Sequence, residues 1–502
     1  MKAVEKIFHA RLGKQGAAGA LLLIGLALRL RQYLTGRSLW LDEAMLALNI
    51  VRRDFWGLFR PLDYDQGAPI GFLLVEKTLA TLFGDHEFVL RLFPLATGIA
   101  ALGLFYLLIR RLTSGMGRLA ALALFAVSPA LVYYASEVKQ YSLDVFVTIG
   151  LFLLSLPLFD DEADRKAFLW LAGAGVLALW FSHPALFVLG GIGSGLVWKF
   201  ASERKGTSLI RTLWLGGAWL FNLGILYLVS LRHLRQNAFL MDFWQENFLP
   251  LPPWSQPAWF GGVFGSLIRT QAGISLPGLF GVMLVLGWFF LWTKNRPLAL
   301  AMLGVLGFSL VAAALRMYPF GGRLSLFLVP LTLVLAGHCL SALEERLLSF
   351  RLAGSLLSLA IGLALVYAPA SDSFQNFVTP KYFEHIRPAI SNLAQNWQPG
   401  DVLFVSYGAT PAFDFYAARY GLGEVTYSTS QPADYLAPPA LAHRLEPLAD
   451  SPRAWILFSH VYERGDFNEK DFLLASLNEM GKKKREFRTP GTSVYLYLYD
   501  LR

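Results

Sequence analysis

Long apolar runs separated by short polar connections dominate the first three quarters of the chain. Eleven runs approach or reach the roughly 17–25 residues that a helix needs to cross a bilayer. They cover residues 16–34, 88–109, 119–135, 141–159, 167–182, 184–200, 212–231, 277–293, 297–315, 322–342 and 352–369. The pattern predicts an all-α polytopic membrane domain over residues 1–369, with about 11 transmembrane helices.

Basic residues are unevenly distributed among the connections. The predicted inside segments carry 17 Lys and Arg residues, whereas the short outside turns carry only Lys139, Arg316 and Arg323. Because cytoplasmic loops are enriched in Lys and Arg, we expect a cytoplasmic N-terminus and an extracytoplasmic C-terminus. The first apolar run follows a basic segment and has no small-residue cleavage site after it, so we interpret it as a membrane helix.

Two long outer loops interrupt the series of spans. The first, residues 35–87, contains "DEAMLALNIVRR" and "IGFLLVEKTLATLF", two short amphipathic stretches typical of helices that lie along the membrane surface. The second, residues 232–276, is rich in Trp, Phe and Pro. Such residues suit either an interfacial anchor or a cover over a site on this face.

The composition changes after residue 370 to that of a soluble domain. "DVLFVSYG" and "RAWILFSH" resemble buried strands, and "SVYLYLYD" alternates like a half-buried strand. "RPAISNLAQNW", "TPAFDFYAARYG" and "DFLLASLNEMG" have helical periodicity. Residues 370–502 are therefore predicted to form a small extracytoplasmic α/β domain.

The overall composition supports a membrane protein. Of 502 residues, 55% are hydrophobic and only 16% charged, which is more apolar material than one soluble core requires. The net charge of +9 is scattered over loop ends, which does not favour nucleic-acid binding. Cys339 is the single cysteine, so the chain has neither an internal disulfide nor a cysteine metal site.

Ionisable residues gather on the predicted outer face, where their desolvation requires a partner or a function. They are Asp42, Glu43, Asp63, Asp65, His86, Glu87, Arg91, Glu137, Lys139, Tyr141, Asp144, His183, Arg316 and Arg323.

Structural roles compete with functional ones at several of these positions. Asp42 stands where an N-cap would accept backbone N–H groups, and Asp65 lies in a segment typical of turns. His183 precedes Pro184 and is either a packing residue or a ligand. Arg323 is harder to assign to packing, because a cation entering a helix on the outer side opposes the usual charge bias. A bound phosphate would explain it.

Glu137, Lys139 and Tyr141 occupy alternate positions in "YYASEVKQYSLD", at the mouth of a predicted helical hairpin. They form either an interfacial belt with one ion pair or part of a site. The chain has no GxxxxGK[ST] motif, no internal repeat and no paired broken helices, so little in it favours a pump or a transporter.

The ordered pieces "WLDEA", "DQGAPI", "FGDHEFVLRLFP" and "SPALVYYASEVKQYSLD" resemble the GT-C superfamily of integral membrane glycosyltransferases. The most similar groups are the protein O-mannosyltransferase-like and aminoarabinose-transferase-like enzymes. The resemblance covers residues 1–340 and is clearest in the first 150. It implies a polyprenyl-phosphate sugar donor and inverting transfer on the extracytoplasmic side of the membrane.

The resemblance also implies roles for the acidic residues. Asp42 falls at the position of the general base, with Glu43 beside it and Asp65 at the second acidic position. Ala68-Pro69-Ile70 departs from the fuller Pro-Pro-Leu of many relatives. A carboxylate can take the proton of an acceptor hydroxyl, and neighbouring carboxylates raise the pKa of one another.

Lys139 falls at the basic position of the family's turn, where Arg is usual, so its contact with phosphate would be a point charge. With Arg323 and Tyr141 it is predicted to bind the donor phosphate. Glu137, His183 and His86 are candidate contacts of a substrate or a divalent metal, and the requirement for a metal stays open.

The partners implied are a polyprenyl-phosphate sugar, an acceptor that is a lipid, a glycan or a protein, and a membrane, which we expect to be the bacterial inner membrane. Two other functions stay open at this point. One is transport or flipping of a lipid-linked sugar, and the other is a non-catalytic membrane scaffold.

Overall fold

The computed structural model describes residues 2–160, 164–346, 351–436, 438–449 and 451–501. The chain forms two compact units, each assembled from three segments. Unit 1 comprises Met1–Thr35, Phe55–Phe83 and Arg91–Thr379, and unit 2 comprises Gly36–Asp54, Gly84–Leu90 and Pro380–Arg502.

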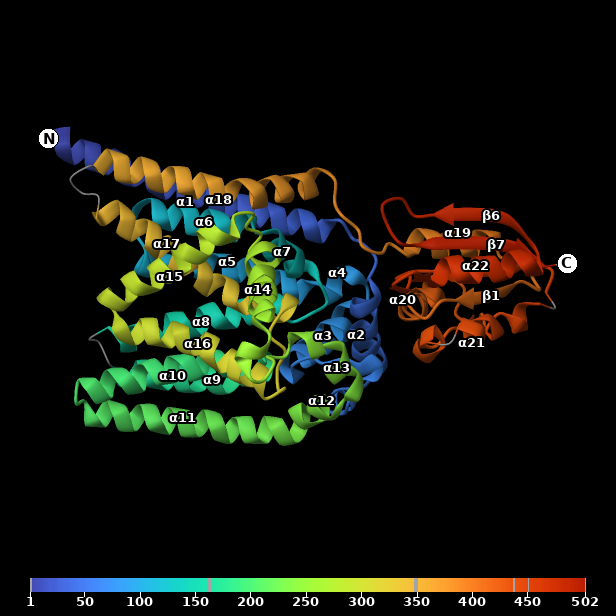
Figure 1. Ribbon diagram of the computed structural model, residues 1–502, viewed down its shortest axis with the longest axis horizontal. Helices are drawn as coiled ribbons and strands as arrows, with labels where there is room; N and C mark the ends of the chain where they lie inside the picture. The colour runs from blue at the N-terminus through green and yellow to red at the C-terminus, as the bar shows by residue number, and fades with distance from the viewer. Residues whose placement is uncertain (1, 161–163, 347–350, 437, 450, 502) are drawn as a thin grey trace. The chain divides into compact units, whose positions relative to one another are not determined.

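Unit 1 is helical (Figure 1). Its longer helices are α1 (Lys2–Leu34), α3 (Ile70–Phe83), α5 (Leu92–Leu112), α6 (Gly115–Val127), α8 (Tyr141–Phe159), α9 (Arg165–Phe181), α10 (Ala185–Ser202), α11 (Gly206–Leu226), α14 (Pro257–Ser266), α15 (Pro277–Lys294), α16 (Arg296–Ala314), α17 (Val329–Arg346) and α18 (Arg351–Val378). The short helices α7 (Pro129–Tyr133), α12 (Arg232–Gln236) and α13 (Ala238–Phe243) lie in the connections.

The helices confirm a polytopic membrane protein. In the described residues, 9 helices are long and apolar enough to span a bilayer, and the pair formed by α6 and Pro129–Ser136, bent by 50°, makes a tenth. The predicted span at 167–182 corresponds to α9, which has only 17 residues. The last predicted span continues past residue 369 through Pro369 to Val378.

Close backbone packing holds α10 against α16, and Figure 1 shows these helices side by side with α11. A Cβ atom on Gly191 would lie 2.4 Å from the carbonyl oxygen of Ala301, closer than atoms can approach. Small residues at such a contact let two membrane helices gain dispersion energy, which is needed because lipid supplies no hydrophobic force between them.

A five-stranded sheet organises unit 2. The strand order is β2 (Ser428–Thr429), β1 (Val402–Val405), β3 (Ala454–Phe458), β7 (Tyr495–Asp500) and β6 (Lys482–Arg488). Strand β1 is parallel to β2 and β3, whereas β7 is antiparallel to β3 and β6. A small hairpin pairs β4 (Glu463–Arg464) with β5 (Phe467–Asn468).

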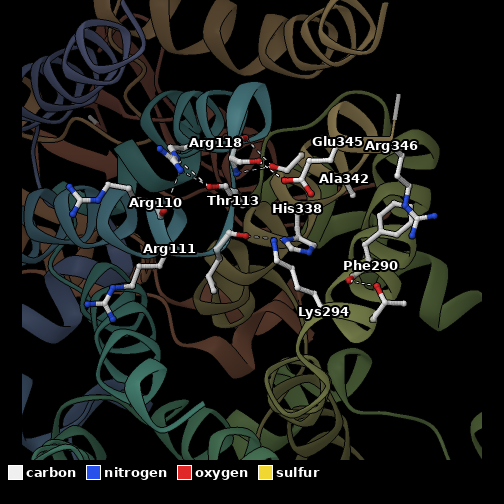
Figure 2. A pocket seen from close by; sticks show the side chains of 14 residues that line it. Arg110, Arg111, Thr113, Arg118, Phe290, Lys294, His338, Ala342, Glu345 and Arg346 are labelled. Atoms are coloured by element: carbon white, nitrogen blue, oxygen red, sulfur yellow. Dashed lines mark hydrogen bonds between the residues drawn. The ribbon is translucent and has the colours of Figure 1, made fainter. Parts of the chain in front are cut away.

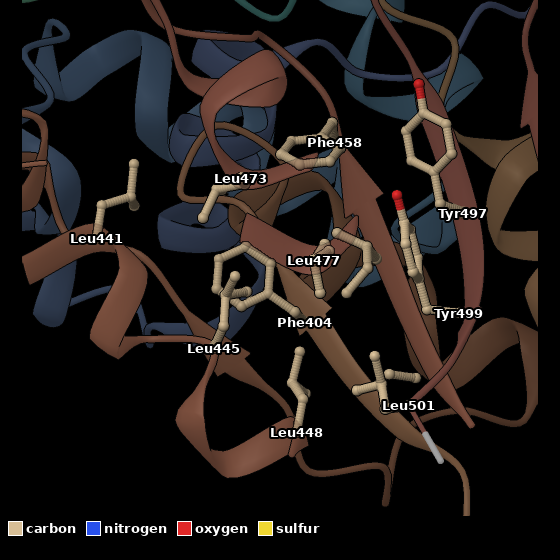
Figure 3. Close-up of a cluster of buried hydrophobic side chains, with 12 residues drawn as sticks. Phe404, Leu441, Leu445, Leu448, Phe458, Leu473, Leu477, Tyr497, Tyr499 and Leu501 are labelled. Atoms are coloured by element: carbon tan, nitrogen blue, oxygen red, sulfur yellow. The ribbon is translucent and has the colours of Figure 1, made fainter. Parts of the chain in front are cut away.

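Apolar side chains cover one face of this sheet (Figure 3). Phe404, Phe458 and Tyr497 from the strands pack against Leu473 and Leu477 of α22 (Glu469–Met480). Unit 2 also contains α19 (Arg387–Asn396), α20 (Thr410–Tyr416) and α21 (Pro438–His443). The predicted α/β organisation is therefore present, although the charged edge strand β6 was not predicted.

The first outer loop contributes two pieces to unit 2, the helices α2 (Leu41–Arg52) and α4 (Glu87–Leu90). Helix α2 packs against α20 and buries most of its residues, from Glu43 to Ile50. This grouping was not anticipated by the predicted division of the chain after residue 369. It places Asp42 and Glu43 in the same compact unit as the sheet.

Candidate functional site

The helix that carries Asp42 is capped from elsewhere in unit 2. Its N-cap residue is Trp40, which provides no side-chain cap, so Asp42 itself is a first-turn residue and not the cap. The backbone N–H of Leu41 instead donates to Oε2 of Glu384 at 2.9 Å. Asp42 is half-buried and lies where its charge favours the positive end of the helix dipole.

Glu384 also binds His460. Its Oε1 lies 2.6 Å from Nδ1 of His460, whose ring stands 6.4 Å from that of Trp40. The hydrogen bond to Glu384 raises the pKa of His460, burial opposes this effect, and the negative charges of Glu384 and Asp42 add to it. The His460 imidazole, which is hydrogen-bonded to Glu384, therefore interacts electrostatically with the carboxylate of Asp42.

The chain before α2 is fixed by the same segment. Ser38 Oγ lies 2.9 Å from Nδ1 of His385 and accepts the backbone N–H of Arg387 at 3.2 Å. An Arg387 side-chain N–H group also donates to the carbonyl of Gly36. Residues 36–41 are therefore held along residues 384–387, which leaves the start of α2 little freedom.

Glu43 is fully buried and faces Arg37, with Oε1 and Nη2 4.0 Å apart. The pair places a second carboxylate one residue after Asp42 and sets a guanidinium against it. Glu87, which also belongs to unit 2, accepts a hydrogen bond from the hydroxyl of Tyr416 at 2.7 Å and forms an ion pair with Arg387 at 3.1 Å. His86 is exposed at the turn that begins α4, where its carbonyl accepts the N–H of Val89.

A second group of predicted residues lies in unit 1. Tyr64 and Asp65 have left-handed backbone conformations, with φ of 60° and 53°. Such strain in residues other than glycine is often found at functional sites. Asn237 from the second outer loop donates to Oδ1 of Asp65 at 2.7 Å.

The next residue connects this turn to Lys139. The buried Nζ of Lys139 donates to Oε1 of Gln66 at 2.6 Å, and its backbone N–H donates to the carbonyl of Glu137 at 2.7 Å. Glu137 is fully buried in the turn before α8. The structure therefore brings the Asp65 turn and the Lys139 turn together, although 73 residues separate Gln66 from Lys139.

Aromatic rings surround Arg323. Its Cζ lies 5.7 Å from the ring centroid of Tyr141, the first residue of α8, and 6.0 Å from that of Trp244. Tyr134 packs edge-on against Tyr141 at 5.1 Å. Arg323 and Tyr141, two of the residues that we predicted to bind the donor phosphate, therefore lie next to each other. Trp244 of the second outer loop lies against the same guanidinium.

His183 lies in the break between α9 and α10 and is half-buried, and its carbonyl accepts the N–H of Leu186. Nothing in its described contacts joins it to Lys139. Within the described residues, no group of three or more His, Cys, Asp and Glu side chains is arranged to hold a metal ion.

The predicted residues thus fall into two groups. Asp42, Glu43 and His86 belong to unit 2, and the remainder belong to unit 1: Asp65, Glu137, Lys139, Tyr141, His183 and Arg323. Sequence reasoning missed Glu384, His460, Gln66 and Asn237. No local signal marks Glu384, because its partner Leu41 lies 343 residues away.

Comparison with solved structures identifies proteins that share the fold of this chain. The chain is similar to ArnT from Cupriavidus metallidurans in the apo state, with a TM-score of 0.55 and 14% identity over 97% of this chain and 98% of that one. It is also similar to the same ArnT bound to undecaprenyl phosphate, with a TM-score of 0.53 and 17% identity over the same shares.

An oligosaccharyltransferase from Archaeoglobus fulgidus, in complex with Zn and sulfate, gives a TM-score of 0.50 and 11% identity over 96% of this chain and 73% of that one. These proteins are GT-C glycosyltransferases, and the chain therefore has the GT-C fold. No family model and no curated protein sequence matches the chain.

Proposed function

We propose that this protein is an inverting glycosyltransferase, which moves a sugar from a polyprenyl-phosphate donor to an acceptor on the extracytoplasmic face of the membrane. The similarity to an ArnT structure bound to undecaprenyl phosphate, over nearly the full length of both chains, is the observation that carries the proposal. The excess of basic residues in the predicted inside connections supports the sidedness.

The chemistry requires an acceptor held in place, a group that takes its proton and cations that stabilise charge on the leaving phosphate. Lys139 and Arg323 are suited to the last role because an amide and two aromatic rings fix their positions in unit 1. The exposed aromatic faces of the second outer loop are suited to sugar rings.

Asp42 is our candidate for the general base, and Glu384 and His460 are positioning residues for it. In this proposal Asp42 takes the proton of the acceptor hydroxyl as the acceptor oxygen bonds to the anomeric carbon. The bond from that carbon to the donor phosphate oxygen breaks, and the polyprenyl phosphate leaves with the electron pair. The anomeric configuration inverts in this single displacement.

The test is sugar transfer by the full chain in nanodiscs, from a panel of polyprenyl-phosphate sugars to membrane extract. Asp42→Asn should lose transfer but keep donor binding, while Asp466→Asn, at an exposed loop of the same unit, should match the wild type. Equal transfer by Asp42→Asn and wild type would refute the role of Asp42. Donor binding without transfer by any form would favour the transporter.

A further inference from the structure

A basic pocket of about 320 Å³ opens among the ends of α5 and α17, the start of α6 and the end of α15 (Figure 2). Its volume falls within the roughly 300–1,000 Å³ of small-molecule sites. Its charged lining consists of five cations and one carboxylate: Arg110, Arg111, Arg118, Lys294, Arg346 and Glu345. The pocket is thus concave and strongly positive.

This pocket is distant from the candidate site in unit 1. The start of α5 packs against the start of α8, where Ser142 Oγ donates to the carbonyl of Pro94 at 2.9 Å. The pocket lies at the other end of α5, a helix of 21 residues and therefore about 30 Å long. It is separated from the Tyr141 end of α8 by about the thickness of a bilayer core.

Several lining groups are held in place by contacts within the chain. Arg118 donates from Nη2 to the carbonyl of Thr113 at 2.8 Å, and Arg346 lies 4.5 Å from the ring centroid of Phe290. The buried His338 is 2.9 Å from the carbonyl of Leu112. Figure 2 shows that these lining side chains come from separate helices.

The positive charge is mostly uncompensated within the described part of the chain. Arg110, Arg111, Lys294 and Arg346 have no carboxylate within ion-pair distance there. Glu345 is engaged, because its Oε1 accepts the hydroxyl of Ser114 at 3.0 Å. An anion with several acceptor oxygens, such as a phosphate group, would satisfy both the charge and the donors.

Apolar surface lies beside this positive charge. Leu107 is 43% exposed and precedes Arg111 by four residues on α5, and Leu286 is 42% exposed and precedes Phe290 by four residues on α15. Residues four apart share a helix face, so each leucine lies one turn from the pocket lining. A phospholipid could place its phosphate in the cationic pocket and its acyl chains on the apolar surface beside it, whereas a free phosphate would contact only the pocket.

We propose that this pocket binds the phosphate headgroup of an anionic phospholipid, with the acyl chains along α5 and α15. Basic pockets between helices at a membrane surface are suited to such headgroups, and each cation near the surface contributes measurably. The proposal does not depend on the glycosyltransferase activity.

The experiment measures lipid binding to the delipidated full chain by native mass spectrometry. Phosphatidylglycerol and phosphatidylcholine are added separately to the wild type, to Arg110→Gln/Arg111→Gln and to Arg165→Gln/Lys166→Gln. The last variant loses the same charge from exposed residues outside the pocket. We expect wild type to prefer phosphatidylglycerol, the pocket variant to bind it about tenfold more weakly or worse, and the control to match wild type.

Glu345→Gln provides a variant with the opposite expected effect, because it removes the acidic charge but keeps an acceptor for Ser114; it should tighten binding. Equal loss in both double variants, or equal binding of the two lipids by wild type, would overturn the proposal. Titration with inorganic phosphate tests the other source. Saturable phosphate binding that requires Arg110 and Arg111, without preference for phosphatidylglycerol, would overturn the lipid assignment.

Discussion

Glu384 accepts the backbone N–H of Leu41 at 2.9 Å, and thereby caps the helix whose next residue is Asp42. A carboxylate of the C-terminal segment thus completes the helix that begins with the "LDEA" part of the first-loop motif. Its second oxygen binds His460. The candidate base Asp42 is therefore positioned by two residues of the C-terminal segment, Glu384 and His460.

Removal of this cap should weaken unit 2 and the alignment of Asp42. We expect Glu384→Ala to lower the stability of unit 2 by about 1–3 kcal/mol, because the half-buried N–H of Leu41 and the His460 imidazole lose an acceptor. Glu384→Gln, which keeps one acceptor, should lose less. Limited proteolysis of the full chain measures the relative stability of wild type, Glu384→Gln and Glu384→Ala. Equal resistance of Glu384→Ala and wild type would contradict the prediction.

The stability of unit 2 should depend on pH through His460. The pKa of this residue in the folded state is raised above its ordinary value of 6.5, chiefly by the hydrogen bond to Glu384. A raised pKa stabilises the fold fully below 6.5 and loses that contribution as the pH rises through the folded-state pKa. Thermal unfolding from pH 5.5 to 9 should show this decline in wild type and a flatter curve in His460→Gln.

Lys139→Met should weaken donor binding. A hydrogen bond to a charged group contributes about 1.5–3 kcal/mol, so the loss should be about 10- to 150-fold in dissociation constant. Lys139→Arg should restore part of the affinity, and Lys166→Met, an exposed residue of α9, should change little. Isothermal titration with a polyprenyl-phosphate sugar checks this, and unchanged affinity in Lys139→Met would remove it from the phosphate site.

The ring of Tyr141 should contribute to donor binding through its contact with Arg323. Tyr141→Phe keeps the face that lies 5.7 Å from the guanidinium carbon, whereas Tyr141→Leu removes it. A cation–π contact contributes about 0.5–2 kcal/mol. We expect donor affinity to be about two- to thirtyfold weaker in the second variant than in the first. A comparable loss in both variants would assign the effect to the hydroxyl.

The α10–α16 contact offers a matched pair of glycines. Gly191→Ala would place a methyl group against the carbonyl of Ala301, and overpacking of this kind costs about 1–3 kcal/mol. Gly193 has only an ordinary contact at 3.8 Å with Trp219, so Gly193→Ala should be tolerated. Thermal unfolding in detergent should separate the two variants, and identical melting would show that α16 moves aside at no cost.

Hydropathy predicted most of the membrane helices because each long apolar run indicates a span by itself. It did not predict that α18 continues to Val378, because the polar residues after Pro369 suggest that the helix ends there. In unit 2, the apolar strands β1, β3 and β7 were predictable. Strand β6, "KKKREFR", was not, because its charges are those of a protected sheet edge.

The candidate site was predictable only where its residues follow one another closely. Lys139 and Tyr141 belong to one turn, and Asp42 and Glu43 are adjacent, so short patterns reveal them. Gln66 and His460 take their significance from contacts with distant segments. A single sequence carries no periodicity that spans such separations, so these residues emerge only from the folded structure.

The composition of unit 2 has a consequence for how the protein is made. Residues 36–54 leave the ribosome early, but their capping residue Glu384 is synthesised 343 residues after Leu41. At about 5–20 residues per second, this interval lasts roughly 17–70 s. Throughout it the helix of Asp42 lacks its cap, so the candidate base cannot be positioned until residue 384 and the segment around it have been synthesised.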